Sequence, residues 1–251
     1  MRVLGLDPSL TNYGWAVHDT SGGSLSGDPP RCVARGRFQT GSKELFVARY
    51  MQLRERLADL IRDQRPDRVG IEFPVFDNLF SEGMYGLFLF SCEALLTANV
   101  NVVFWSPLQV KAHARESLGR PKGWVMMKPD MVEAAKADTG TKGVWNHNEA
   151  DAYLVGRLSG RFWNYYEGGI PETELTPTER KYFTEVKTYT RGKRAGETVR
   201  RGVVYREDER FFNWAEVLDG ESTTGGEERE VGVGEGGDHE DPQDGIVARH
   251  P

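Results

Sequence analysis

The sequence predicts an α/β fold in which a mixed β-sheet is flanked by helices, and three observations support this prediction. Two apolar strands joined by a turn open the chain, at 2–7 and 14–17, and a third extended segment follows near 35–40. Helical and extended patterns then alternate as far as about residue 165. With 38% hydrophobic residues in a chain of 251, there is ample apolar material for a packed core.

The elements after the opening hairpin are expected in alternating order. The first helix is expected from about residue 44 to residue 64, because apolar side chains recur there every three or four positions. Pro66 then ends the helix, and a short strand leads to Glu72. A long helix up to about residue 100 comes next. The remaining expected elements are a strand at 102–105, shorter helices at about 107–117 and 129–138, and a helix that contains Asp151.

Three carboxylates stand where three of these elements end or begin. Asp7 closes the first strand, Glu72 closes the strand after Pro66, and Asp151 lies early in the last helix. If these acids met in one cleft they would raise one another's pKa, whereas a pair of Mg²⁺ ions would be neutralised by them and could clamp a scissile phosphate. The three positions therefore predict a metal-dependent nuclease site.

Two of the three acids, Asp7 and Asp151, also have an ordinary structural explanation, and Glu72 has a weaker one. An Asp before Pro, as at Asp7, is often only a turn former. Asp151 could lie on a solvated helix face, although its neighbours Ala150 and Ala152 are apolar and an ionised carboxylate among them needs a partner. Glu72 directly follows an apolar strand and has no helix to cap. We therefore interpret the three acids as one functional set.

Four motifs follow one another along residues 1 to 165. They are the hairpin at 6–17, Ile71-Glu72-Phe73-Pro74, the strand 102–105 followed by Val110-Lys111, and Glu149-Ala150-Asp151-Ala152. Each motif alone is weak, but their order and spacing resemble the RuvC-type Holliday junction resolvases of the ribonuclease-H-like superfamily. The resemblance implies a ribonuclease-H-like fold for this part of the chain.

The same resemblance implies an activity and a cofactor. It implies a Mg²⁺-dependent endonuclease, a hydrolase of DNA recombination and repair, that resolves Holliday (four-way) junctions by paired nicks in branched DNA. Two Mg²⁺ ions per active site are implied, with Mn²⁺ able to substitute. Lys111 would hold the scissile or adjacent phosphate, and a solvated helix face is the alternative explanation of this lysine.

Paired nicks need two active sites, and the resemblance implies a homodimer formed through the helix after Glu72. In this chain that helix carries more apolar side chains than one buried face uses. The surplus side chains expected to form the contact are Met84, Leu87, Phe88, Phe90 and Ser91. A wholly buried helix is the alternative.

The position three residues before the last acid departs from the family pattern. Many relatives carry Asp or His there, one helical turn away on the same face, whereas this chain carries Asn148. An amide oxygen can bind a hard cation but brings no charge, and Asn is also a favoured N-cap. His147, four residues before Asp151, reaches the same face. We expect Asn148 first, and His147 second, as the fourth metal ligand or as a group that orients water.

Four further residues are candidates for binding DNA. Phe73 and Phe76 could wedge between bases at a junction, and either could equally be a core residue. Lys122 and Lys128 stand beside prolines in a segment that could follow a DNA backbone. Lysines beside prolines are also common on protein surfaces, so the alternative is an ordinary solvated loop.

Charge is distributed unevenly along the chain, whose formal net charge is −6. Residues 1–174 carry 20 basic and 21 acidic side chains, residues 175–212 carry 10 and 6, and residues 213–251 carry 2 and 11. The local charges are therefore −1, +4 and −9. The acidity belongs to a C-terminal segment too poor in apolar residues to offset the entropy of ordering it.

We therefore expect three parts: a ribonuclease-H-like nuclease domain at 1–168, a basic β-hairpin extension at 169–218 and a disordered acidic tail at 219–251. The hairpin is expected from Tyr182 to Tyr205, with two β-prone runs around a basic turn. Such a turn suits a DNA-binding arm, and it also suits a strand edge protected by charge. The basic side chains of this turn are Arg191, Lys193 and Arg194.

The sequence also indicates a compartment. Met1 and Arg2 lead directly into the first strand without a signal peptide, and two isolated cysteines suggest neither a disulfide framework nor a zinc site. The most apolar run, residues 84–105, is interrupted by Glu93 and two asparagines, so no membrane span is expected. We expect a cytoplasmic protein, or one in the host cytoplasm if the source is a bacteriophage.

Two rival functions differ in class from a nuclease. A catalytically weak or silent module that only binds branched DNA is the first, and the uncharged Asn148 is its best support. The second is an actin-like ATPase or sugar kinase, which would also open with a strand-end Asp in a hairpin. Such proteins need two duplicated halves, and no second Asp-x-Gly motif of that kind follows Glu72.

Overall fold

The computed structural model describes residues 1–20, 31–73, 82–140, 143–184, 186–188, 190–191, 198–200, 203–206 and 209–213. All of them lie in the first of the two units into which the chain divides, Met1–Asp219 and Gly220–Pro251. The acidic tail expected at 219–251 lies outside the described residues.

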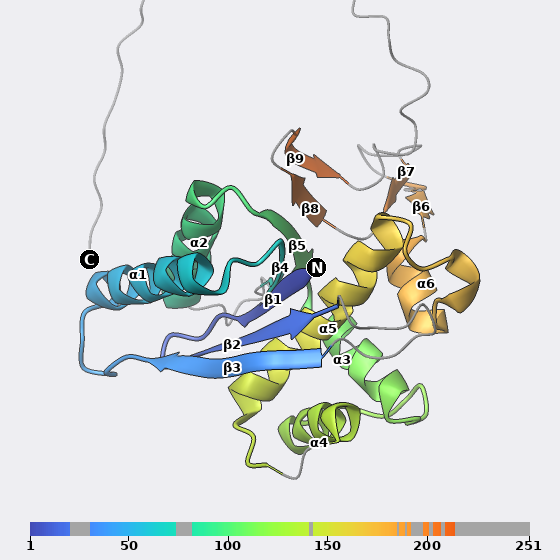
Figure 1. Ribbon diagram of the computed structural model, residues 1–251, viewed down its shortest axis with the longest axis horizontal. Helices are drawn as coiled ribbons and strands as arrows, with labels where there is room; N and C mark the ends of the chain where they lie inside the picture. Colours follow the sequence, from blue (N-terminus) through green and yellow to red (C-terminus); the bar gives the residue numbers. More distant parts are fainter. Residues whose placement is uncertain are drawn as a thin grey trace, which may run out of the picture. The chain divides into compact units, whose positions relative to one another are not determined.

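One mixed sheet forms the centre of the first unit (Figure 1). β1, β2 and β3 are antiparallel neighbours, β4 is parallel to β1, β5 is parallel to β4, and β8 and β9 are antiparallel beyond β5. Across the sheet the order is β3-β2-β1-β4-β5-β8-β9. The strands are β1 (Arg2–Asp7), β2 (Asn12–Asp19), β3 (Arg31–Gln39), β4 (Arg68–Glu72), β5 (Asn101–Trp105), β8 (Val203–Arg206) and β9 (Glu209–Asn213). This arrangement confirms the predicted α/β class.

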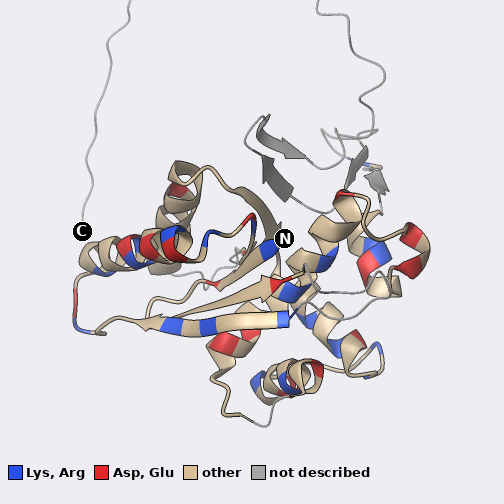
Figure 2. Cartoon of the chain, in the orientation of Figure 1, with Lys and Arg blue, Asp and Glu red and all other residues tan. Residues whose placement is uncertain are grey.

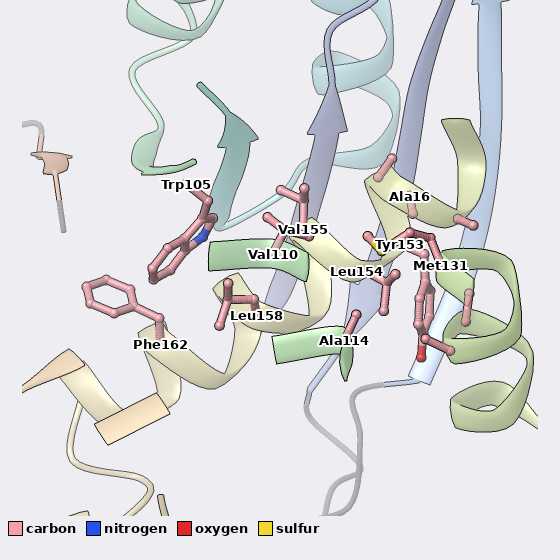
Figure 3. Close-up of a cluster of buried hydrophobic side chains, with 14 of the residues drawn as sticks. Ala16, Trp105, Val110, Ala114, Met131, Tyr153, Leu154, Val155, Leu158 and Phe162 are labelled. Carbon is pink, nitrogen blue, oxygen red and sulfur yellow. The ribbon is translucent and has the colours of Figure 1, made fainter. Parts of the chain in front are cut away.

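Helices cover both faces of the sheet, and each face has its own hydrophobic core. α1 and α2 pack on one face against Leu4 and Leu6 of β1. α3, α4 and α5 pack on the other face, around Tyr153, Leu154 and Phe162 (Figure 3). Among the described helices, none has both the length and the apolar composition that crossing a membrane requires. The five helices are α1 (Phe46–Gln64), α2 (Glu82–Thr97), α3 (Pro107–Ser117), α4 (Lys128–Thr139) and α5 (His147–Tyr166).

Local sequence signals set where these helices begin and end. α1 ends at Arg65, whose backbone is left-handed with a φ of 46°, directly before Pro66. α3 begins after Ser106, whose hydroxyl accepts a hydrogen bond from the Gln109 amide in a capping box. Pro107 occupies the first turn, where its missing N–H costs nothing. α3 therefore spans the same residues, 107–117, that the sequence predicts.

α5 lies unusually close to the sheet because two strand positions lack a side chain. A Cβ atom at Gly5 of β1 would come 2.2 Å from the carbonyl oxygen of Ala152. A Cβ atom at Gly14 of β2 would come 2.1 Å from the carbonyl oxygen of Asn148. Any larger residue at either place would push the helix away from the strands. The two glycines thereby fix how near the beginning of α5 approaches the end of β1.

The predicted β-hairpin is partly wrong at its start. Tyr182 and Phe183 were expected in its first strand, but both are buried in a helix, α6 (Pro177–Phe183). The physical reason is a capping box in which Thr176 accepts from the amide of Glu179, with Pro177 in the first turn. This signal overrides the β propensity of the two aromatic residues. A short 3₁₀ helix, η1 (Glu172–Glu174), precedes it.

A hairpin does follow α6, but it is shorter than expected. β6 (Val186–Thr188) and β7 (Thr198–Arg200) pair as an antiparallel two-stranded sheet. The run from Val203 to Tyr205 was expected in the same hairpin, and instead it belongs to β8, which pairs with β5 in the main sheet. The C-terminal segment thus extends the main sheet by two strands rather than forming one separate arm.

The exposed face of α2 also differs from the expected one. The side chains of Leu87, Phe88 and Ser91 are buried, with at most 7% exposed, so the prediction that they form a free apolar surface is wrong. They repeat at helical spacing toward the sheet, and the Tyr13 hydroxyl donates a hydrogen bond to Ser91. The large apolar side chains that α2 does expose are Tyr85, Leu89 and Leu96.

Candidate active site

Asp7 and Glu72 lie side by side at the same edge of the sheet. β1 and β4 are parallel and hydrogen-bonded, and Leu6 pairs with Ile71. The next residue of each strand is the acid, so the two carboxylates extend from adjacent strands in register. Side chains alternate along a strand, so Asp7 points to the same face as Gly5, against which α5 packs. The two acids therefore share the face covered by α5.

Asp151 comes to this edge from α5. Asn148, one turn earlier, is where the helix touches Gly14 of β2, and Gly14 is the residue that pairs with Asp7. Asp151 itself is partly exposed, whereas its neighbours Ala150 and Ala152 are fully buried. The first turns of α5 thus deliver a third carboxylate to the end of β1.

Burial raises the pKa of all three carboxylates, and repulsion between them adds to the shifts of Asp7 and Glu72. Burial raises the pKa of Asp7 well above its ordinary value, and the charges of Glu72 and Asp151 raise it further. Burial and then the charge of Asp151 raise the pKa of Glu72 to about 8. Burial raises the pKa of Asp151 to about 6, although Lys111 and Lys128 act in the opposite direction. The negative charge at this edge therefore exceeds what the nearby lysines offset.

This donor set suits a hard divalent cation. Carboxylate oxygens are the ligands that Mg²⁺ and Mn²⁺ prefer, and a cation here would relieve the repulsion that helps to raise the pKa values of Asp7 and Glu72. Within the described ranges, no three His, Cys, Asp or Glu side chains are already spaced to hold one metal ion. The fit therefore rests on the type and the charge of the donors.

Lys111 and Lys128 are the two cations whose charges lower the pKa values of the three acids. Lys111, exposed on α3, lowers the pKa of Glu72 and of Asp151. Lys128, exposed at the start of α4, lowers the pKa of Asp7 and of Asp151. The sequence predicts that Lys128 belongs to a segment that could follow a DNA backbone. In the structure it is the first residue of α4, and its charge lowers the pKa of two of the acids. Lys122, six residues earlier, is exposed in the same connecting segment.

Asn148 and His147 occupy different environments. The N-cap of α5 is Asn146 rather than Asn148, whose buried side chain donates a hydrogen bond to the backbone carbonyl of Asn12. The amide of Asn148 thereby ties α5 to the start of β2. Burial lowers the pKa of the neighbouring His147, and the charges of Lys128 and Arg37 lower it further. His147 is therefore held in its neutral form more firmly than an isolated histidine.

Two residues at this edge were not among the sequence candidates. Asn12 contributes through its backbone carbonyl, which no residue-type pattern reveals. Arg37 belongs to β3, along which basic residues recur (Figure 2), and its guanidinium donates a hydrogen bond to the side chain of Asn12. The alternation of Arg31, Arg35 and Arg37 in the sequence was the available signal for it.

Of the aromatic and C-terminal candidates, only Phe73 and Arg191 are among the described residues. The ring of Phe73 lies 5.0 Å from that of Phe88 and 6.5 Å from that of Phe104, and it lines a cavity of about 620 Å³ beside α2. Phe73 thus has the packing of a residue at the margin of the core. Arg191 is exposed. Phe76, Lys193 and Arg194 lie outside the described residues.

Comparison with known proteins finds a partial sequence likeness to curated RuvC proteins. No family model matches the chain. A segment of 72 residues, 29% of the chain, is 36% identical to the crossover junction endodeoxyribonuclease RuvC of Rhizobium rhizogenes and covers 39% of that protein. The RuvC of Agrobacterium fabrum is 35% identical over 72 residues and is also covered to 39%. The chain therefore matches about two-fifths of the length of these curated relatives.

Solved structures extend the likeness to the fold. Thermus thermophilus RuvC superposes with a TM-score of 0.54 at 21% identity, covering 67% of this chain and 98% of that one. The same protein in complex with a Holliday junction substrate gives a TM-score of 0.52 at 20% identity, with the same coverage. These findings confirm the predicted ribonuclease-H-like fold and the resemblance to RuvC-type resolvases. A bacteriophage origin stays a prediction.

Proposed function

We propose that this chain is a divalent-metal-dependent endonuclease that cuts phosphodiester bonds in branched DNA and resolves four-way junctions by paired nicks. One observation carries the proposal. Three carboxylates from two adjacent strands and one helix meet at one edge of a RuvC-like fold, and each pair of them raises a pKa. Acids that served only to stabilise the fold would be paired with cations instead.

The three acids are the proposed metal ligands. Asp7, Glu72 and Asp151 would hold two Mg²⁺ ions, for which Mn²⁺ could substitute, with Asn148 or His147 as the fourth group. The hydrogen bond from the Asn148 amide to Asn12 favours a positioning role for this residue. His147, whose pKa is lowered, keeps a neutral ring that can orient water or accept its proton.

The proposed reaction is the hydrolysis of one phosphodiester bond. When bound, the divalent ions would activate water and neutralise charge on the scissile phosphate. The water oxygen forms a new bond to phosphorus, the bond from phosphorus to the 3′ oxygen breaks, and that oxygen receives a proton to become a hydroxyl. Lys111 holds the phosphate and stabilises the charge that develops on its oxygens.

The remaining sequence candidates are proposed to contact DNA outside the scissile bond. Phe73 and Phe76 would act on unstacked bases at the branch, and Lys122 and Lys128 would contact phosphates. The basic residues Arg191, Lys193 and Arg194 would contact the arms. We keep the division into a nuclease domain at 1–168, an extension at 169–218 and a tail at 219–251, and the expected cytoplasmic location, as parts of this proposal.

Two cuts in one junction require two copies of this site, so we propose a homodimer. α2 supports it with an exposed apolar stripe that Tyr85 and Leu89 form one helical turn apart. The stripe borders the cavity of about 620 Å³ that Leu89 lines. A Leu89→Lys variant should be a monomer in light scattering at micromolar concentration, whereas Val47→Ala, an exposed change on α1, should remain a dimer. A monomeric native protein, with and without junction DNA, would remove this part of the proposal.

A catalytically weak DNA-binding module is the second candidate, and the uncharged Asn148 favours it. The amide nitrogen of Asn148 donates to Asn12, and its amide oxygen could bind a cation but brings no charge to the acids. Weak binding of a second metal ion would follow.

One experiment separates the two functions. The full chain is incubated with a four-way junction, a three-way junction, a flap and a linear duplex, each in Mg²⁺, in Mn²⁺ and in EDTA. The endonuclease is expected to cut the four-way junction symmetrically in Mg²⁺ or Mn²⁺ and to leave every substrate intact in EDTA. Junction binding without any cleavage in either metal would support the module and would overturn the proposed enzyme.

A further inference from the structure

The segment that joins α3 to α4 exposes three large apolar side chains in a row of four. Trp124 is 43% exposed, Val125 is 75% exposed and Met127 is 61% exposed. Exposed apolar side chains that stand together, unlike single ones, usually mark a surface that binds something. The segment is flanked by Lys122 and Lys128, which are both exposed.

This exposure does not come from a loosely attached loop. The Trp124 amide donates a hydrogen bond to the carbonyl of Pro121 at 2.9 Å, which closes a turn. Met126, between the exposed side chains, is only 4% exposed and belongs to the core around α5. The Met127 amide donates to the Asp130 carboxylate at 2.7 Å and fixes the start of α4. The exposed side chains are therefore presented by a backbone that is anchored at three points.

The ring of Trp124 is held by a cation of its own. The guanidinium of Arg120 lies over this ring, 5.1 Å from its centre. Arg120 is in turn held by the Glu133 carboxylate at 3.1 Å. The indole is thereby oriented by α4, while more than two-fifths of its surface stays open. An oriented, partly open aromatic ring is what a stacking partner needs.

The end of this segment also lies near enough to the acids for the charge of its lysine to act on them. Lys128 follows Met127 directly, and its charge lowers the pKa of Asp7 and of Asp151. Within the described ranges, neither Lys122 nor Lys128 forms an ion pair. Two available cations with an aromatic ring between them match the alternation of phosphate and base along a nucleic acid strand. A protein partner would need no such alternation.

We propose that Trp124 is a stacking platform for an unpaired DNA base beside the scissile phosphate, with Lys122 and Lys128 holding the phosphates on either side. The inference rests on the proposed function and adds to it a residue that selects branched over linear DNA. A base can stack on Trp124 only after it has left its own duplex, which is easiest at a branch. The platform therefore favours DNA whose bases are already unpaired.

The test compares Trp124→Ala, Trp124→Phe and the matched exposed control Val47→Ala in the full chain. Binding to a fluorescent four-way junction and to a linear duplex of the same sequence is measured by anisotropy in EDTA. Stacking of one base on an aromatic ring corresponds to a loss of roughly 5- to 150-fold in junction affinity on truncation to Ala. Trp124→Phe should keep most of the affinity, and Val47→Ala should match the native protein.

Two further readouts distinguish stacking from charge and from misfolding. The Trp124→Ala loss should be confined to the junction, with the Kd for linear duplex unchanged and the slope of log Kd against log salt preserved. Lys122→Ala should instead weaken both DNAs and reduce that slope by about one. Equal weakening of both DNAs by Trp124→Ala, with a lower melting temperature, would mean a structural role and would overturn the proposal.

The outcome is independent of whether the chain cleaves DNA. If the native protein binds junctions but cuts nothing in Mg²⁺ or Mn²⁺, a junction-specific loss in Trp124→Ala still supports the platform while the enzyme is rejected. If the native protein cuts junctions and Trp124→Ala binds and cuts like the native protein, the platform is rejected while the enzyme stands. Absence of any junction binding by the native protein would overturn both.

Discussion

Glu179 and Glu72 are both carboxylates withdrawn from water, and their pKa values move in opposite directions. Burial would raise the pKa of Glu179, but hydrogen bonds from Arg161 and His113 outweigh it and lower the pKa well below the ordinary range. The pKa of Glu72 is raised to about 8, because burial and the charge of Asp151 act in the same direction. The difference lies in what surrounds each acid.

The environment of Glu179 is complete within the chain. Arg161 of α5 donates two hydrogen bonds to it, each at 2.8 Å, and His113 of α3 lies at 3.3 Å. Only 2% of the Glu179 side chain is exposed. The group joins α6 to two helices of the core, so its function is to hold the C-terminal segment in place.

Asp7, Glu72 and Asp151, unlike Glu179, have no hydrogen-bonded cation among the described residues and lie near one another instead. The fold brings three like charges to one edge of the sheet and places Lys111 and Lys128 near enough to offset them only in part. Such an arrangement costs stability unless a cation from outside joins it. A buried acid that is paired with its own cation thus indicates a structural role. Acids that converge without such a cation indicate a functional site.

The first prediction concerns stability and has the largest effect. Arg161→Met leaves the buried Glu179 without its main partner, so the free energy of unfolding should fall by about 3–5 kcal/mol. Arg62→Met, which removes a surface ion pair with Asp59, should leave it almost unchanged. Urea denaturation followed by circular dichroism measures both. Equal stability of the two variants would show that the Glu179 group does not hold α6.

The second prediction uses pH to distinguish the two acids. Because the pKa of Glu179 is lowered in the folded protein, its contribution is fully present above the ordinary Glu value of about 4.3 and is lost as pH falls below it. The difference in unfolding free energy between the native protein and Glu179→Gln should therefore shrink between pH 6 and pH 3. A difference that stays constant over this range would contradict the assigned shift.

The third prediction has the opposite sign and a smaller size. With its pKa raised to about 8 in the folded protein, Glu72 in EDTA costs stability increasingly as pH rises from about 4.3 through 8. Glu72→Gln should therefore be more stable than the native protein by roughly 0.5–2 kcal/mol at pH 8 and equal to it near pH 4. Urea titrations at the two pH values test this, and a destabilised Glu72→Gln at pH 8 would make this acid a structural one.

Much of the fold was predictable because its signals are local. Apolar periodicity predicted α1, β4 and β5, and the helix expected at about 107–117 is α3, which begins at the local capping signal of Ser106 and Pro107. The strand-end positions of Asp7 and Glu72 were also visible, because adjacent parallel strands end at the same edge. The helix at Tyr182 and Phe183 was missed, since their β propensity is overridden by a capping box and by packing against α5.

Contacts through space were not predictable. The sequence around Lys128 does not indicate that this lysine lowers the pKa of Asp7. That effect depends on how α4 packs against α5. The hydrogen bond from Asn148 to the Asn12 carbonyl requires the close approach that Gly14 permits. The exposure of Trp124 was not predictable either, because the sequence does not show that Met126, rather than its apolar neighbours, enters the core.

The central claim is that the three converging acids make a metal-dependent nuclease, and acid-to-amide substitution tests it most directly. Glu72→Gln is compared with the matched control Glu149→Gln on a four-way junction in Mg²⁺. Glu149 lies on the same helix as Asp151, and it forms an ion pair with Arg35 of β3. Glu72→Gln should lose roughly a thousandfold or more in cleavage rate while binding the junction as tightly or more tightly, and Glu149→Gln should cut at nearly the native rate. Cleavage by Glu72→Gln at the native rate would contradict the account.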